Sequence, residues 1–138
     1  MMLVFSLNGQ REIGHPAFMS PHFSPIVISE DKVFVANTPC DTIDVLDAKS
    51  GRLLRRIPVG LDPVSLAVRP DGRELWVANH VSDSVSVIDL DQSKRTFMHV
   101  VATVQDIDPE TKATRFDEPV GIAFASNRKA YVALSSEN

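Results

Sequence analysis

The feature that most constrains this sequence is an internal repeat of 42 residues. The segment Val33–Asn37 (VFVAN) recurs 42 residues later as Leu75–Asn79 (LWVAN). Ile43–Asp47 (IDVLD) recurs at the same spacing as Val85–Asp89 (VSVID). Because both segments keep one register, the chain must fold as similar units that stack on their neighbours.

A third copy of the repeat is incomplete. It begins at Val120 and continues with Tyr131–Ala133, which we align with Leu75–Val77 at a spacing of 56 residues. The second unit therefore carries an insertion within 91–118. The polar stretch 106–112, which is rich in turn-forming residues, is the candidate for it.

Each unit reads as four short strands. In the second unit they are 64–69, 74–79, 84–89 and a fourth within 96–104. The two complete units contain no stretch of helical periodicity long enough for a helix, which disfavours helical solenoids and parallel βαβ layers. A β-sandwich would not explain the constant register. Four antiparallel strands repeating at this length are typical of a β-propeller blade.

The sequence therefore predicts an all-β fold, a partial β-propeller of about two and a half four-stranded antiparallel blades. The expected parts are an N-terminal lead-in (1–22), blade 1 (23–63), blade 2 with an insertion of about 14 residues (64–119) and the truncated first half of blade 3 (120–138). Closed propellers have about four to eight blades. We therefore expect a piece of a larger propeller; the alternative is a short protein that closes by self-association.

Composition excludes several classes of protein. With 43% hydrophobic residues and a net charge of −4, the chain is not disordered and is a poor match for nucleic acid. No apolar run approaches the roughly 18 residues of a membrane-spanning helix, so we expect no membrane insertion. The apolar start Met1–Leu7 is too short for a signal peptide. A single cysteine, Cys40, excludes an intramolecular disulfide.

The segment Pro70–Asn79, followed by Asp83–Asp89, resembles the YVTN family of β-propeller repeats. Tyr131–Leu134 is a departing copy, with Leu where the motif has Asn. The resemblance implies a blade-by-blade fold in a bacterial or archaeal protein that works outside the cytoplasm, so we expect a periplasmic or secreted parent. It implies no activity, because members range from surface-layer scaffolds to parts of redox enzymes.

In a propeller, the loops from second to third strand and the loops between blades share one face, where ligands commonly bind. The candidate ligand-binding residues on this face are the polar residues of those loops: Asn37, Asp41, Asp62, Asn79, His80, Asp83, Asp117 and Glu118. His80 and Asp83 are metal-ligand types, so they form a candidate metal or proton-transfer pair. The alternative is that His80 is an ordinary loop residue. The repeated asparagines equally suit tight turns after strands.

The lead-in carries His15 and His22, seven residues apart. They could ligate a metal or lie against a haem carried elsewhere, although no Cys-x-x-Cys-His motif is present; the alternative is ordinary packing. The sequence shows no Gly-x-Ser-x-Gly elbow and no phosphate-binding loop. We therefore predict no catalytic residue and no cofactor.

Two functions remain open. The residues favour a non-catalytic module that binds or scaffolds a protein or small ligand on its loop face, within a larger extracytoplasmic protein. The alternative is the propeller domain of an enzyme, either lactonase-like or redox- and haem-associated. Further expected partners are the remaining blades of the same propeller or a second copy of the chain.

Overall fold

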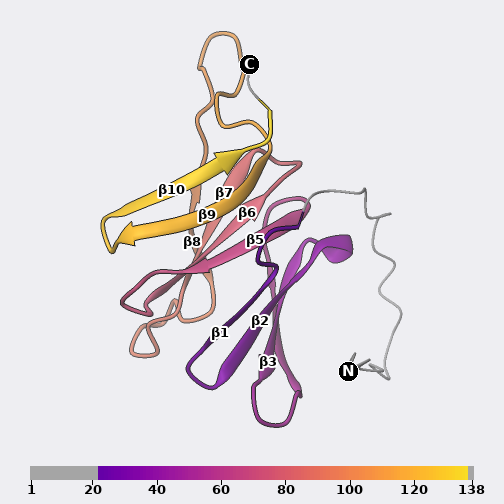
Figure 1. Ribbon diagram of the computed structural model, residues 1–138, viewed down its shortest axis with the longest axis vertical. Coiled ribbons are helices and arrows are strands. Elements are labelled where there is room, and N and C mark those ends of the chain that lie inside the picture. Colours follow the sequence, from indigo (N-terminus) through magenta and orange to yellow (C-terminus); the bar gives the residue numbers. More distant parts are fainter. Residues whose placement is uncertain (1–21, 137–138) are drawn as a thin grey trace.

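The computed structural model describes residues 22–136, and in this part of the chain it contains ten β-strands and no α-helix (Figure 1). The predicted lead-in, His15 included, lies outside the described residues except for its last residue. The strands are β1 (Ile26–Ser29), β2 (Lys32–Asn37), β3 (Thr42–Asp47), β4 (Leu53–Pro58), β5 (Pro63–Val68), β6 (Glu74–Asn79), β7 (Ser84–Asp89), β8 (Val100–Val104), β9 (Pro119–Ser126) and β10 (Lys129–Leu134). A short 3-10 turn, η1 (Thr38–Cys40), follows β2.

The strands form three antiparallel sheets in chain order. The first sheet contains β1–β4, the second β5–β8, and the third only β9 and β10. Figure 1 shows the sheets side by side, with β5 between β1 and β9. The predicted all-β fold, a partial propeller of two four-stranded blades and half of another, is confirmed.

Alternation along the strands gives each sheet two apolar faces. One face of the second sheet carries Leu66, Leu75 and Val77, each at most 2% exposed. This face packs against Phe34 and Ile43 of the first sheet. Because neighbouring side chains on a strand point to opposite sides, the residues between them build a second core on the other face.

That second core joins the second sheet to the third. It contains Val64, Ala78 and Val85, together with Ile122 from β9. Trp76 meets Phe124 edge-on, with the ring centroids 5.2 Å apart, a favoured aromatic geometry. The middle sheet is therefore covered on both sides.

The insertion of the second unit is divided between two connections. Residues 90–99 join β7 to β8, whereas 48–52 suffice between β3 and β4. Residues 105–118 join β8 to β9, whereas 59–62 suffice between β4 and β5. The polar stretch 106–112 thus belongs to the second connection, whereas residues 91–99 of the first connection lie in the same predicted range, 91–118.

The proposed alignment of the third copy is wrong by one residue in β10. Tyr131 lies opposite Ala123, just as Trp76 lies opposite Ala67. Tyr131 therefore occupies the place of Trp76 and not that of Leu75. The turn between β9 and β10 is shorter than the turn between β5 and β6. The residues of β10 therefore pair with β9 in a register that differs by one residue from the predicted alignment.

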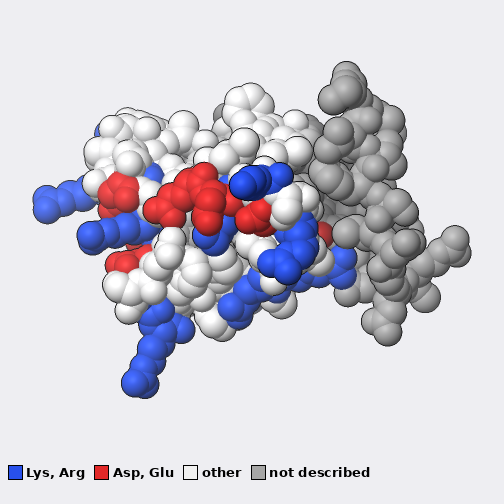
Figure 2. All heavy atoms as spheres, turned by 90° about the horizontal axis from the view of Figure 1, so that it is seen from below, with Lys and Arg blue, Asp and Glu red and all other residues white. Residues whose placement is uncertain are grey.

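Charged side chains gather at the end of the molecule where β1–β2, β3–β4 and β5–β6 turn. Figure 2 looks onto this end, where acidic side chains lie among basic ones. Arg69, for example, pairs with Asp71 at 2.8 Å and also with Glu74. The described residues include no helix of the length and apolarity that a bilayer crossing demands.

Leu75→Ala should test the packing between the first two sheets. The side chain is fully buried, so truncation removes apolar contacts and leaves a cavity, lowering the free energy of unfolding by about 2–5 kcal/mol. Urea titration followed by circular dichroism measures the change. The control Leu54→Ala, at a site 41% exposed, should cost far less; equal losses would contradict the assigned core.

Candidate functional site

Four loops gather at the end of the molecule opposite the charged turns, and we call this the loop end. It comprises residues 38–41, 59–62, 80–83 and the long connection 105–118. In Figure 1 the long connection projects at the top, and η1 is the purple coil at the right, at the upper end of the first sheet. The eight candidate residues that the sequence predicts for the loop face lie in these loops or on the strand ends that enter them.

Two of the candidates bind the first sheet to the second. Asp41 Oδ1 accepts a hydrogen bond from the backbone N–H of Asp62 at 2.8 Å. The carbonyl oxygen of Asp62 then accepts the backbone N–H of His80 at 2.9 Å. The loop after β2 is thereby tied to the start of β5 and to the end of β6. We call this arrangement the aspartate latch.

The latch is repeated between the second and third sheets. Asp83 Oδ1 accepts the backbone N–H of Glu118 at 2.9 Å, and the carbonyl oxygen of Glu118 accepts the N–H of Ser135 at 3.0 Å. Asp83 stands 42 residues after Asp41, in the register of the repeat. Asp41, Asp62, Asp83 and Glu118 therefore share a role in joining blades.

The backbone of the latch is left-handed at both partners. Asp41 has φ 55° and Asp83 φ 48°, and the donor residues Asp62 and Glu118 have φ 59° and 47°. Aspartate tolerates this conformation better than most residues because its short carboxylate bonds to nearby main chain. The choice of aspartate in these loops thus has a structural reason as well as a chemical one.

The repeated asparagines organise the strand ends. Asn79 is fully buried, and its Nδ2 donates to Ser84 Oγ at 3.1 Å and to Ser86 Oγ at 3.0 Å. Asn37 Nδ2 donates to Asp44 Oδ2 at 3.3 Å from the matching position. The backbone of Gly60 lies directly on Asn79: a Cβ added to it would stand 2.6 Å from Asn79 Nδ2, too close for any side chain.

His80 is a half-buried histidine whose Nδ1 is buried and has no hydrogen-bond partner. Its candidate partner Asp83 is engaged in the latch. Within residues 22–136, no three His, Cys, Asp or Glu side chains come together as a metal cage would require. Asp117 is half-buried in the long connection. The structure thus brings four of the five acidic candidates into latches rather than into one cluster.

Other features of the loop end were not predicted from the sequence. Leu61 and Val81 are 50% and 52% exposed, and their loops are joined because the Leu61 N–H donates to Ser82 Oγ at 3.0 Å. His22 Nε2 pairs with Thr38 Oγ1 at 2.9 Å. The only signal in the sequence was an apolar residue in each of two loops, Leu61 directly before Asp62 and Val81 two residues before Asp83.

The long connection brings cationic residues to this end. Its turn is built on Asp108, whose Oδ1 accepts the backbone N–H groups of Glu110 and Thr111. These bonds hold the pKa of Asp108 below its ordinary value. Lys112 and Arg115 follow in this connection, whereas the other three loops contain no lysine or arginine.

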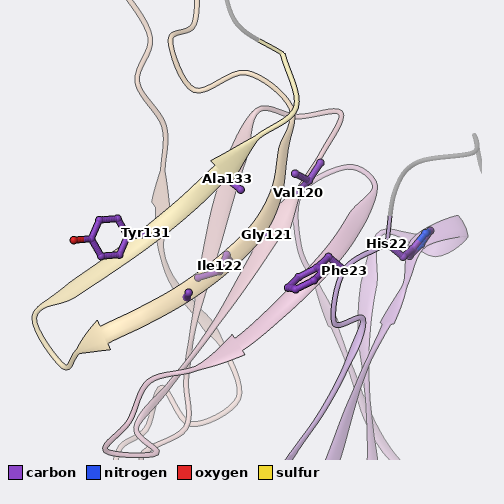
Figure 3. A pocket seen from close by; sticks show the side chains of 8 residues that line it. His22, Phe23, Val120, Gly121, Ile122, Tyr131 and Ala133 are labelled. Atoms are coloured by element: carbon purple, nitrogen blue, oxygen red, sulfur yellow. The ribbon is translucent and has the colours of Figure 1, made fainter.

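A separate hollow lies on the open face of the third sheet. It has a volume of about 470 Å³. Its floor is formed by Gly121, Ala123 and Ala133, and Phe23 and Tyr131 lie beside it (Figure 3). The exposed surface of the lining is almost wholly apolar, and His22 and Tyr131 are the two lining residues whose side chains carry a polar group.

A buried carboxylate also accepts hydrogen bonds from the connection between β7 and β8. Asp89 is 4% exposed and accepts a hydrogen bond from Thr96 Oγ1 at 2.6 Å. This bond, the backbone N–H of Asp91 and the charge of Lys94 hold the pKa of Asp89 below its ordinary value, although burial opposes them. Asp47 occupies the matching position and accepts bonds from Ser50, which likewise lower its pKa.

The repeated sheets, their shared cores and the latches define the chain as a segment of a β-propeller. No family model matches it. Protein NirF of Pseudomonas aeruginosa is 36% identical over 84 residues, which cover 59% of this chain and 21% of NirF. Antigen Lp49 of Leptospira interrogans is 36% identical over 50 residues, 36% of this chain and 11% of that protein. The chain therefore matches only a small part of each relative's length.

Two solved structures share the fold. Hydrazine synthase of Kuenenia stuttgartiensis superposes with a TM-score of 0.64 and 29% identity, over 92% of this chain and 33% of its own. Dihydro-heme d1 dehydrogenase NirN, solved in complex with DHE, superposes with a TM-score of 0.57 and 23% identity, over 90% of this chain and 24% of its own. The second likeness concerns the fold alone.

Asp83→Ala should weaken the packing of the second sheet on the third sheet. The variant loses the acceptor for the Glu118 N–H and places alanine in a left-handed conformation, so we expect a loss of about 2 kcal/mol in the free energy of unfolding. Asp83→Asn keeps an acceptor oxygen and tolerates the backbone, and should stay close to wild type. Urea titration measures both; an alanine variant as stable as the asparagine variant would refute the latch.

Asp89→Asn should make stability less dependent on pH. Because folding lowers the pKa of Asp89, its carboxylate contributes stability above the unfolded pKa, about 3.9, and this contribution disappears as pH falls through the folded pKa. The variant should be about 1–2 kcal/mol less stable than wild type at pH 7, with a smaller difference at pH 3. Urea titrations at the two pH values measure this; an equal difference at both would contradict the assignment.

Proposed function

We propose that this chain is a segment of the propeller domain of an enzyme, of the redox- and haem-associated kind, and that its loop end faces the cofactor. The observation that carries the enzyme part is the match to hydrazine synthase over 92% of this chain at 29% identity. The 36% identity to NirF supports a related propeller. Because the chain spans only a part of each of these proteins, the activity of the whole belongs to the proposal.

The loop end contains the types of side chain that bind a haem-type group. His80 offers a half-buried imidazole, and imidazole is a usual axial ligand of haem iron. Leu61 and Val81 offer exposed apolar surface on adjoining loops. Lys112 and Arg115 of the long connection are the cations that carboxylate substituents would require.

The roles of this chain's residues follow from those contacts. Exposed apolar side chains would cover one side of the macrocycle and exclude water from it. His80, and His22 held by Thr38, would orient the group through their imidazoles. A haem-type group, when bound, supplies one-electron redox chemistry, and the protein tunes it by axial ligand and burial.

The wider assignment of the parent protein is also a proposal. We propose that the repeat belongs to the YVTN family and that the parent protein works in the periplasm or outside the cell, supported by the resemblance of 70–79 and 83–89 to that family's motif. Phe34, Trp76 and Tyr131 stand at equivalent places in β2, β6 and β10, where this motif begins.

A binding or scaffolding module without catalysis is the second candidate function. The observation that favours it is the engagement of Asp41 and Asp83 in the latches, which leaves their carboxylates tied to backbone N–H groups. On this view the loop end would bind a protein or a small ligand through Leu61, Val81 and His80. The two functions differ in whether a haem-type group binds at the loop end.

Titration of the 138-residue chain with hemin tests the haem proposal. We expect saturable binding in roughly the micromolar range, seen as a shift of the Soret absorbance band. His80→Ala and His22→Ala should each weaken binding by about tenfold or more, because each removes an imidazole at the loop end.

His99→Ala is the matched control, since His99 lies away from the loop end, before β8, and pairs with Arg55. It should bind hemin as wild type does. Equal affinity in all three histidine variants, or no shift of the band, would overturn the haem proposal and leave the binding module as the better account.

A further inference from the structure

The two end sheets of the molecule each expose one apolar face. We call the face that a sheet turns to its predecessor the front, and the opposite face the back. The front of the first sheet exposes Ile26 (57%) and Ile28 (69%), and the back of the third sheet exposes Tyr131 (57%). In Figure 1 these two sheets flank the second sheet.

The front of the first sheet repeats a face that is buried elsewhere in the chain. Ile26 lies opposite Val35 in the ladder, as Leu66 lies opposite Val77 in the second sheet. Leu66 and Val77 are 2% and 0% exposed because the first sheet covers them. The same positions in the first sheet are exposed only because no sheet precedes them among the described residues.

The back of the third sheet likewise repeats a covered face. Tyr131 stands where Trp76 stands in the second sheet, and Ala133 where Ala78 stands. Trp76 packs edge-on against Phe124 of the following sheet, and Ala78 is fully buried. The third sheet presents the same pattern of a large ring beside small side chains, and no sheet follows it within residues 22–136.

The hollow of about 470 Å³ lies on this exposed back face. Its floor of glycine and alanine leaves room for larger side chains, and Phe23 and Tyr131 bound it (Figure 3). Ile26 and Ile28 are branched aliphatic side chains, which suit the apolar lining of this hollow. The core between the second and third sheets is packed in this way, with Ala78 and Ala67 of one sheet beside Phe124 and Ile122 of the other.

We propose that two copies of this chain together form the propeller domain, in which the back of the third sheet of each copy binds the front of the first sheet of the other. Front-to-back contact already occurs twice within the chain, and the new contact continues the same series. Such a contact is heterologous, so it closes when the copies form a ring. Two copies bring six sheets, each contributing three, which lies within the range of about four to eight blades of closed propellers.

Light scattering coupled to size-exclusion chromatography tests this on the 138-residue chain. At protein concentrations of roughly 1 to 100 µM we expect a species of twice 15.2 kDa that dissociates on dilution. Ile28→Glu on the front face and Ala133→Glu on the back face should each weaken dimerisation by about tenfold or more, since each buries a charge in the contact. Both sites are exposed, so circular dichroism should show unchanged β-structure.

Val101→Glu is the matched control, at a site 46% exposed on the outer strand of the second sheet, and should dimerise as wild type does. A mixture of the Ile28→Glu and Ala133→Glu proteins should associate more strongly than either alone, because one of the two contacts is then intact. Loss of the dimer in only one of the two variants would indicate a contact between like faces and overturn the proposal. A folded wild-type monomer at all of these protein concentrations would also overturn it, and would indicate that sheets of another polypeptide cover the two faces.

Discussion

The packing of one sheet on the next is the interaction on which the rest of the structure depends. Each strand alternates its side chains between two apolar faces, so no sheet can bury its surface alone. The second sheet illustrates this: Leu75 and Val77 pack on the first sheet, while Val64 and Ala78 pack on the third. Loops, latches and turns all lie at the two ends of strands whose positions this packing sets.

The period of the sequence was sufficient to predict the sheets. A register of 42 residues, shared by two strands of each unit, implies equivalent strands at equivalent places, and alternation then implies their two faces. The details that depend on turns were not accessible in this way. The division of the extra residues between two connections and the shift of Tyr131 by one position arise from connection lengths and ladder pairing, which the period of apolar residues does not record.

The sequence also located the loop end and its polar residues, but not what those residues do there. Asp41 meets the backbone of a residue 21 positions away, and Asp83 meets one 35 positions away. Neither separation follows from the motif, because the length of the connection before the next sheet varies. The exposure of Leu61 and Val81 was equally hidden, since single apolar residues in loops are common.

In the aspartate latch the hydrogen-bond acceptor is a side chain, whereas the donor belongs to the main chain. The acceptor is a particular carboxylate, at Asp41 or Asp83, whereas the donor is a backbone N–H, at Asp62 or Glu118. Any residue other than proline that tolerates a left-handed backbone can supply that donor. Adding or exchanging a whole unit therefore requires little agreement between neighbours beyond one aspartate, and the connection between them is free to change in length. This chain contains an example: the connection between sheets is short at residues 59–62 and long at residues 105–118, and the latch is present at both.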